Sequence, residues 1–446
     1  MVKKIFLLIS ILMIASLMLS ACGGPSETPT PEPPAPEPTD APAPPTDEPV
    51  DTGPPDLTGE VITIYHFGDL SGPYASITGP LVNGATDMVA YLNEQGGIFG
   101  ATIEMQFADT GGDVAEAVAI YDRFTTDDDN IIMFIMYGSP EEEALYERLA
   151  EDQIPVIAAG LSTVAFYGIP DGYIFGQAAT YPDQFGYFLD YVVANWDSLK
   201  PEGAGDDINV AYISWPTAYG QGALTDESRA YAESLGVSIV AEEVFDVAPG
   251  ADTTTAILNA EAAGANLIYT NTLAFGPASI LNDLNALGLR GSFFVGGNNW
   301  AMDVSTYAFL ADPAYAVGFC APFPFAWWHD GRDNPAIDLA WNLFEANERT
   351  PGEQNVGRLL LMGGVDLAKF AIENAILEVG FENLTGEAVY NAMTKIKDYN
   401  VLNGLAVADF TGGRRSPNLL QFRCIEGGPD AFTIKQDFTE APELRP

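Results

Sequence analysis

Short apolar runs alternate with longer amphipathic segments from residue 61 onward. The first expected strands span 61–67, 101–109, 130–137 and 154–160, and the expected helices between them span 79–95, 113–126 and 140–152. The strand runs are almost continuously apolar, which is typical of strands that helices cover on both faces. The alternation therefore predicts an α/β fold with a doubly wound parallel sheet.

A second α/β series begins near Tyr181. Its expected helices span 181–196, 219–236, 252–264 and 276–288, and its expected strands span 207–214, 237–245, 265–272 and 292–297. Helical patterns at 338–349 and 356–380 follow, and the last 40 or so residues are strand-like and irregular. The region from 59 to 446 exceeds the size of a usual single core, so two lobes of similar size are expected.

The first 58 residues differ in composition from the rest. Lys3 and Lys4 precede an apolar run that ends at Leu19, which is typical of a secretory signal peptide over residues 1–21. Leu19-Ser20-Ala21-Cys22 resembles the bacterial lipobox, which implies that Cys22 becomes a lipidated N-terminus. An ordinary signal peptide with a chance cysteine is the alternative. Residues 22–58 are rich in Pro, Thr, Glu and Asp, and we expect a disordered tether.

The charge is strongly negative, with 62 acidic against 18 basic residues and a net charge of −44. Nucleic acid and anionic lipid are poor partners for such a surface, so the membrane is expected to be reached through the lipid anchor only. A cation-binding or salt-adapted protein is one interpretation. We favour a solubilising surface, because the acidic residues are scattered among the helices.

Few residues offer metal or catalytic chemistry. Cys320 and Cys424 are the two cysteines of the predicted globular part, and export would allow them to form a disulfide. With only His66 and His329 and no CxxC or HExxH pattern, we expect no metal. Phosphate-binding glycine motifs and a GxSxG elbow are also missing from the sequence, so we expect no cofactor and no enzyme.

The loops that follow the first-series strands are candidates for a ligand site. Residues 70–79, 138–143 and 160–168 are rich in Gly, Ser and Thr. In open α/β sheets ligands bind at the carboxyl ends of the strands, and two of these loops lead into helix N-termini, which favour an anion. Ordinary turns and helix caps are the alternative for any one loop.

Three short motifs stand out: "YLNEQGGIFG" at 91–100, "FADT" at 107–110 and "AYGQG" at 218–222. They resemble motifs of the periplasmic solute-binding proteins of type I fold, in the branched-chain amino acid transporter class. The resemblance covers nearly all of 60–440. It implies two doubly wound lobes joined by a three-strand hinge, with residues 60–176 and 323–405 in lobe one and residues 177–322 and 406–446 in lobe two.

The same resemblance implies binding positions. Tyr74 or Ile77 matches the first-loop contact, and the choice between them stays open. The other implied ligand-binding residues are Tyr137, Gly138, Ser139, Gly160, Leu161, Ser162, Tyr219, Leu273, Phe275 and Asn298. Asn298 falls where amino-acid binders commonly place a glutamate for the ammonium group. The expected ligand is therefore an amino acid, an amide, or a small carboxylate or aromatic acid. Phe323, Phe325, Trp327 and Trp328 either face this ligand or, as we favour, pack near the hinge.

These features together predict a monomeric, lipid-anchored, extracytoplasmic receptor that delivers a small molecule to an ABC importer. The permease and ATPase subunits would be other chains. A ligand-binding sensor module for a signalling partner is the alternative, and a hydrolase on the same scaffold is a third hypothesis. Neighbouring permease and ATPase genes would favour transport, whereas a neighbouring kinase gene would favour sensing.

Overall fold

The computed structural model describes residues 53–428 and 431–445. The predicted signal peptide, Cys22 and the tether up to residue 52 lie outside the described residues. Leu57, at the end of the predicted tether, is buried and donates its N–H to the Phe99 carbonyl at 2.8 Å. Among the described residues, no helix has the length and apolar character needed to cross a membrane.

The first sheet has five parallel strands in the order β2-β1-β3-β4-β5. They are β1 (Val61–Gly68), β2 (Thr102–Asp109), β3 (Phe134–Met136), β4 (Val156–Ala158) and β5 (Ile174–Gly176). The residues of β1, β3, β4 and β5 are mostly buried, as Ile64 and Phe67 are in β1, whereas the edge strand β2 is partly exposed. This is the burial expected for a parallel sheet between two helix layers.

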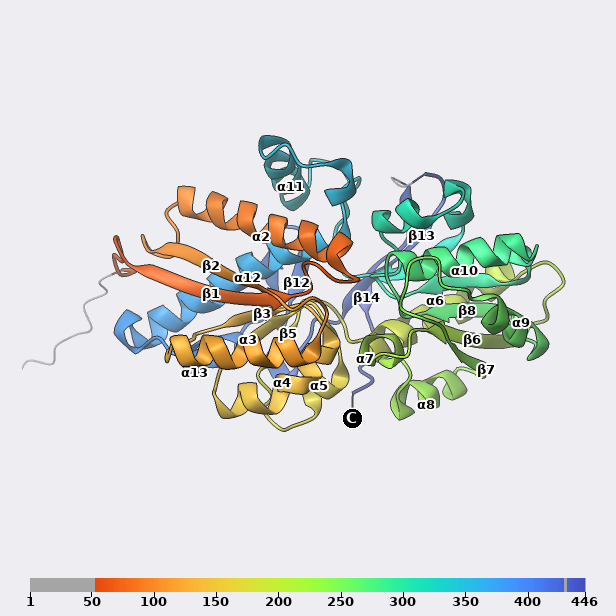
Figure 1. The fold of residues 1–446 in the computed structure, drawn as a ribbon, viewed down its shortest axis with the longest axis horizontal. Helices are drawn as coiled ribbons and strands as arrows, with labels where there is room; N and C mark the ends of the chain where they lie inside the picture. The colour runs from red at the N-terminus through yellow and green to blue at the C-terminus, as the bar shows by residue number, and fades with distance from the viewer. Residues whose placement is uncertain (1–52, 429–430, 446) are drawn as a thin grey trace, which may run out of the picture. The chain divides into compact units, whose positions relative to one another are not determined.

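Helices on both sides of this sheet complete what we call the first lobe. They are α2 (Ala75–Glu94), α3 (Val114–Asp127), α4 (Ser139–Glu151), α5 (Thr163–Tyr167), α12 (Val356–Val379) and α13 (Gly386–Met393). α2 packs against α12, and α3 packs against α4. Figure 1 shows α2 above the sheet and α4 below it. The late segment 356–379 therefore returns to the first lobe.

The second sheet has seven strands in the order β14-β13-β10-β9-β8-β6-β7. They are β6 (Ile208–Ser214), β7 (Val237–Val244), β8 (Leu267–Thr270), β9 (Phe294–Gly297), β10 (Phe319–Phe323), β13 (Leu419–Ile425) and β14 (Phe432–Glu440). Strands β6 to β10 are parallel, whereas β13 and β14 add an antiparallel edge. This sheet and its helices are called the second lobe.

The helices of the second lobe are α6 (Tyr181–Leu199), α7 (Ala218–Gln221), α8 (Asp226–Ser234), α9 (Thr254–Ala262) and α10 (Phe275–Ala286). The sequence predicted one helix over 219–236, but the structure divides it into α7 and α8. Thr225 begins the second helix because its hydroxyl accepts the Ser228 N–H while the Ser228 hydroxyl accepts the Thr225 N–H. Such a capping box favours a helix start at that residue.

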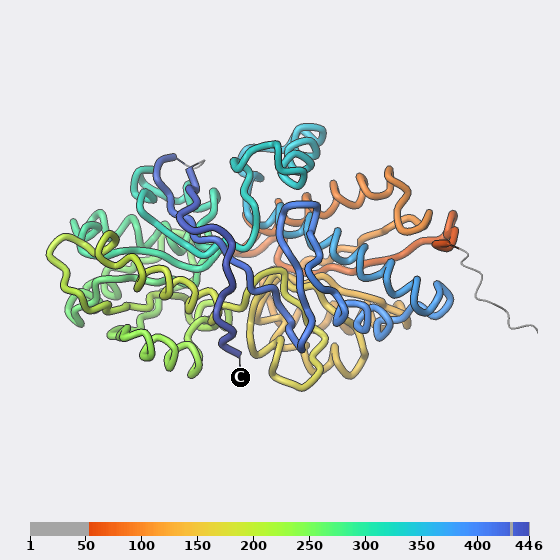
Figure 2. Tube along the Cα trace, turned by 180° about the vertical axis from the view of Figure 1, so that it is seen from behind, coloured from red at the N-terminus to blue at the C-terminus, as the bar shows by residue number. Residues whose placement is uncertain are grey.

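Three segments connect the lobes, over 177–180, 324–334 and 409–418. The second contains no regular element and is followed by α11 (Pro335–Ala346); the third follows a hairpin of β11 (Tyr399–Val401) and β12 (Ala406–Ala408). Figures 1 and 2 both show the blue C-terminal end of the chain at the junction of the lobes. β11 packs on α12 of the first lobe, and β12 pairs with β11, so both strands favour the first lobe. The third boundary between the lobes would then lie after residue 408 and not after 405. The other predicted lobe limits stay a prediction.

The turn between α2 and β2 shows how local sequence determines this fold. Gly97 has φ +62°, a conformation that L side chains rarely adopt, and an added Cβ would lie 1.9 Å from the Ala101 carbonyl oxygen. Asn93 then accepts the Ile103 N–H and donates to the Ile103 carbonyl, at 2.8 and 2.9 Å. The "GGIFG" sequence therefore folds as a tight turn that joins α2 to β2.

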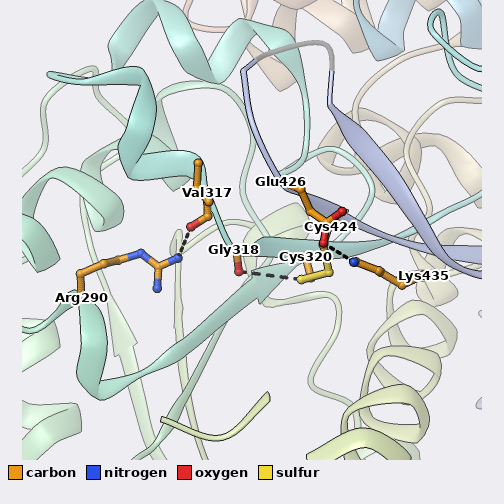
Figure 3. Close-up of a disulfide and its surroundings, with 7 residues drawn as sticks. All are labelled: Arg290, Val317, Gly318, Cys320, Cys424, Glu426 and Lys435. Carbon is orange, nitrogen blue, oxygen red and sulfur yellow. Dashed lines mark hydrogen bonds and ion pairs between the residues drawn. A yellow bond between two sulfur atoms is a disulfide. The ribbon is translucent and has the colours of Figure 1, made fainter. Parts of the chain in front are cut away.

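A disulfide links Cys320 of β10 to Cys424 of β13, which are direct partners in the antiparallel register. Figure 3 shows the bond with Lys435 and Glu426 beside it, where an ion pair joins β14 to the end of β13. On the other side, Arg290 donates to the Val317 carbonyl at 2.8 Å. The disulfide therefore fastens the antiparallel edge of the second sheet to its parallel part.

Candidate ligand-binding site

A cavity of about 40 Å³ lies between the two lobes, at the carboxyl ends of the strands. About 10–15 Å³ of such space suffices for one water molecule, so this cavity has room for a few non-hydrogen atoms. The first lobe lines it with Tyr74, Tyr137, Gly138, Ser139, Pro140, Glu141 and Ala159. The second lobe contributes Tyr181, Tyr219, Leu273 and Trp300.

Asp69 positions Tyr74 at the cavity. The buried Asp69 carboxylate accepts the N–H groups of Gly72 and Tyr74, at 2.5 and 2.8 Å, in the loop that follows β1. Asp109, at the end of β2, accepts the Leu70 N–H at 2.8 Å. Two carboxylates therefore hold this loop in place immediately before α2.

Three consecutive glutamates with different partners lie near the start of α4, and Glu141 and Glu142 belong to its first turn. Glu141 lines the cavity. The Glu142 carboxylate is fully buried and accepts the Gly160 N–H at 3.0 Å, and Glu143 accepts the Ser162 hydroxyl at 2.5 Å. Glutamates in this turn suit the positive end of the helix dipole, and two of the three also fix the loop after β4.

Tyr219 is held by polar contacts within the second lobe. Thr217 caps α7 by accepting the Gly220 N–H at 3.0 Å. The Asn298 amide donates to the Tyr219 hydroxyl at 3.1 Å, and the Asn271 amide donates to the Tyr219 carbonyl. Asn298 therefore lies directly behind the tyrosine that lines the cavity.

Aromatic rings from both lobes pack together at the cavity. The ring centroids of Tyr74 and Tyr137 are 6.4 Å apart, and those of Tyr181 and Tyr219 are 5.2 Å apart. Tyr137 meets Trp300 from the other lobe at 6.1 Å. The Tyr181 and Ser139 hydroxyl oxygens lie 3.1 Å apart and form a hydrogen bond across the lobe interface.

Burial strongly affects the ionisable groups of the cavity. Desolvation, with help from the charges of Glu141 and Asp69, raises the pKa of Tyr74 to about 12. Burial also raises the pKa of Tyr137 and Tyr219 well above the ordinary phenol value. The three hydroxyl groups therefore keep their protons near neutral pH and can donate hydrogen bonds.

Half of the binding residues implied by the sequence lie in this lining: Tyr74, Tyr137, Gly138, Ser139, Tyr219 and Leu273. The other six lie outside it: Ile77, Gly160, Leu161, Ser162, Phe275 and Asn298. Ser162 caps α5 and donates to Glu143, and Gly160 donates its N–H to Glu142. Phe275 packs on Trp215 with centroids 5.0 Å apart. Ligand contact by any of these twelve residues stays a prediction.

Sequence reasoning missed five lining residues: Pro140, Glu141, Ala159, Tyr181 and Trp300. The strand-end signal already covered the first three, because they lie in or beside the loops after β3 and β4. Tyr181 opens the first helix after the first lobe connection, and Trp300 comes two residues after Asn298. A search of all residues beside the predicted loops would have found them.

The aromatic segment 323–328 packs outside the cavity lining. Phe323 and Trp327 have ring centroids 5.3 Å apart, and Trp327 stacks on Phe432 at 4.9 Å. The Trp328 indole donates to the Asn355 carbonyl at 3.2 Å. These contacts correspond to the favoured interpretation of packing near the lobe connection.

A family model described as "Periplasmic binding protein" matches residues 61–427. The chain belongs to the periplasmic binding protein family. Membership implies that the protein binds small molecules and is exported or periplasmic. A comparison with curated proteins finds no match.

Solved structures of other binding proteins share the fold. A branched-chain amino acid ABC transporter protein from Thermus thermophilus, solved with bound valine, is 22% identical; the match covers 87% of this chain and 98% of that one, with a TM-score of 0.73. A fatty acid ABC transporter substrate-binding protein from Thermomonospora curvata is 21% identical, with 88% and 95% covered and a TM-score of 0.71. A solute-binding protein from Rhodopseudomonas palustris, in complex with 3,4-dihydroxybenzoic acid, is 16% identical, with 86% and 98% covered and a TM-score of 0.67.

At these identities the matches show the fold alone, and they confirm the α/β architecture with two lobes predicted from the sequence. The molecules that these proteins are described as transporting or binding differ in chemistry. The ligand class of this periplasmic binding protein therefore depends on the residues that line its own cavity.

Proposed function

We propose that the chain is the extracytoplasmic receptor of an ABC importer and binds its ligand in the cavity between the lobes. The observation that carries the proposal is the lining, because residues at strand ends of both lobes converge on one small cavity. Closure of two lobes around a ligand changes the surface that they present together, and a membrane partner can recognise that surface. Family membership supports a binding role.

Binding is tested with a thermal-shift screen of small amines, amides, amino acids and carboxylates on the chain that begins at Cys22. A compound present at 100 times its Kd raises the free energy of unfolding by about 2.7 kcal/mol. Uptake of the compound by cells that carry the importer should then depend on this chain. A ligand that binds without supporting uptake would contradict the transport role.

Replacing Tyr219 with alanine is expected to weaken binding of that compound at least roughly tenfold, because the substitution removes a ring and a hydroxyl from the cavity wall. Calorimetry on the purified variant measures the change. Tyr231→Ala is the matched control, since Tyr231 lies on α8 outside the cavity lining and its hydroxyl bonds to Asp190 at 2.8 Å. Equal affinities of the two variants would place the ligand elsewhere.

We further propose that Cys22 is the lipidated N-terminus of the mature protein. The support is the sequence Leu19-Ser20-Ala21-Cys22 followed by the proline-rich acidic segment. Two or more acyl chains anchor a protein stably, whereas one chain gives marginal binding. Mass spectrometry of the membrane fraction should find acyl groups on Cys22, and Cys22→Ser should release the protein from the membrane. A wild-type protein that is soluble and begins at another residue would contradict this prediction.

A further inference from the structure

Glu141 brings an uncompensated carboxylate to the cavity. Glu141 is 6% exposed. Among the described residues, its side chain forms neither an ion pair nor a hydrogen bond with another residue, although it lines the cavity. The carboxylate lies against the α-carbon of Gly138, where an added Cβ would be 1.9 Å from Glu141 Oε2. A buried charge without a partner is costly, so this position calls for an explanation.

The surroundings of Glu141 are electrically negative. No lysine, arginine or histidine belongs to the cavity lining formed by residues 53–428 and 431–445. Glu141 interacts with the like charges of the buried Asp69 and Glu142, and Asp69 also acts on Tyr74 and Tyr137. A cavity with this charge favours a positively charged occupant.

The loop groups that would suit an anion are already occupied by the chain itself. Glu142 accepts the Gly160 N–H, and Glu143 accepts the Ser162 hydroxyl. A ligand carboxylate at this edge of the first lobe would therefore compete with two glutamates and face a third. These contacts disfavour the anionic members of the ligand set considered from the sequence.

Five of the ten other lining residues are aromatic. Tyr74 and Tyr137 come from the first lobe, and Tyr181, Tyr219 and Trp300 come from the second. The faces of such rings attract a cation, most strongly where water is excluded. The combination of five rings with one unpaired carboxylate is suited to an ammonium group.

We propose that the cavity binds a small organic monocation, an amine or quaternary ammonium compound without a carboxylate, whose charged nitrogen lies beside Glu141 within the aromatic lining. This inference rests on the proposed function and specifies its ligand class. The cavity volume of about 40 Å³ suits a compact headgroup and excludes a bulky ring system.

The ligand class is tested by calorimetry on the full mature chain with defined probes. Tetramethylammonium and choline are expected to bind. Dimethylbutanol, the uncharged carbon analogue of choline, should bind roughly 30-fold more weakly, because it lacks the cation–π and charge contributions. Glycine betaine should also bind more weakly than choline, since its carboxylate would approach Glu141.

Two variants separate the role of the Glu141 charge from folding. Glu141→Gln keeps the shape of the side chain and should weaken choline binding at least roughly tenfold while leaving dimethylbutanol unchanged. Glu151→Gln, at an exposed position on the same helix, should leave both affinities unchanged. Local unfolding of the helix would weaken the binding of both choline and dimethylbutanol. The ratio of the two affinities therefore reports the contribution of the Glu141 charge.

The pH dependence provides a second readout. Burial raises the pKa of the Glu141 carboxyl above its usual range. A bound cation favours the ionised form, so choline affinity should rise as pH increases through this pKa and then level off. In Glu141→Gln the affinity should no longer follow this rise.

Absence of binding by both cations at millimolar concentration would overturn the inference. If an amino acid or another compound bound instead, and Tyr219→Ala abolished that binding, the proposed receptor function would stand and only the ligand class would be wrong. Tight binding of choline that Glu141→Gln leaves intact would also contradict the proposed position of the nitrogen.

Discussion

Replacing Cys320 and Cys424 together with alanine is expected to lower the free energy of unfolding by about 2–5 kcal/mol. The two cysteines are 104 positions apart in the sequence, so the disulfide closes a long loop in the unfolded chain. A closed loop of about 100 residues corresponds to about 4.7 kcal/mol in the chain-entropy model. Urea denaturation with linear extrapolation measures the difference.

Reduction provides the control for this prediction. Dithiothreitol should lower the stability of the wild type by a similar amount and leave the double variant unchanged. Because β10 and β13 still pair in register without the bond, the native circular dichroism spectrum should be retained in both cases. Two freely alkylated thiols in the untreated protein, or equal stabilities of wild type and variant, would contradict the prediction.

The order of elements could be predicted from sequence because it depends on local patterns. The apolar run of β1 and the capped, periodic segment of α3 are each recognisable within about 15 residues, and Asp113 accepts the N–H groups that begin α3. β5 was not predicted as a strand because the apolar run around it, from Tyr173 to Phe175, is shorter than the runs around β3 and β4. The antiparallel edge formed by β13 and β14 depends on pairing with β10, a contact between distant segments that local periodicity does not report.

The position of the site was more predictable than its chemistry. Tyr74 and Ser139 lie in loops that the strand-end argument singled out, because parallel strands bring their carboxyl ends to one edge, whereas Tyr219 was implied by the family resemblance alone. The sequence did not reveal which of the three glutamates in α4 reaches the cavity, since that depends on the phase of the helix against the neighbouring loop. It also favoured an anionic ligand group at that loop, but the structure gives the Gly160 N–H and the Ser162 hydroxyl to Glu142 and Glu143.

A buried ion cluster joins the two helices that cover one face of the first sheet. Asp87 of α2 accepts hydrogen bonds from Arg358 of α12 at 2.5 Å and from Arg349 at 2.6 and 3.1 Å. The side chains of Asp87 and Arg358 are 2% and 0% exposed. The helices approach closely here. A Cβ added to Gly84 would lie 2.7 Å from the Arg358 carbonyl oxygen, so glycine at this position permits the approach.

Asp87→Asn is therefore expected to lower the free energy of unfolding by about 3–5 kcal/mol. The substitution keeps the shape of the side chain but leaves the buried Arg358 guanidinium with only the more distant Glu353 carboxylate, 3.8 Å away. Charges left buried and unpaired account for most of such losses, whereas the pair itself contributes less. Chemical denaturation of the purified variant measures the loss.

Glu373→Gln is the matched control, because it breaks the Lys369–Glu373 ion pair on the same α12 helix. The two side chains of that pair are 23% and 22% exposed and four residues apart, so water screens the interaction and the expected loss is about 0.5 kcal/mol or less. A loss in Asp87→Asn no greater than in this control would mean that Arg358 finds another partner. A double variant tests the cause of the loss. If the unpaired charge is the cause, replacing Asp87 with leucine and Arg358 with methionine should restore part of the stability that Asp87→Asn loses.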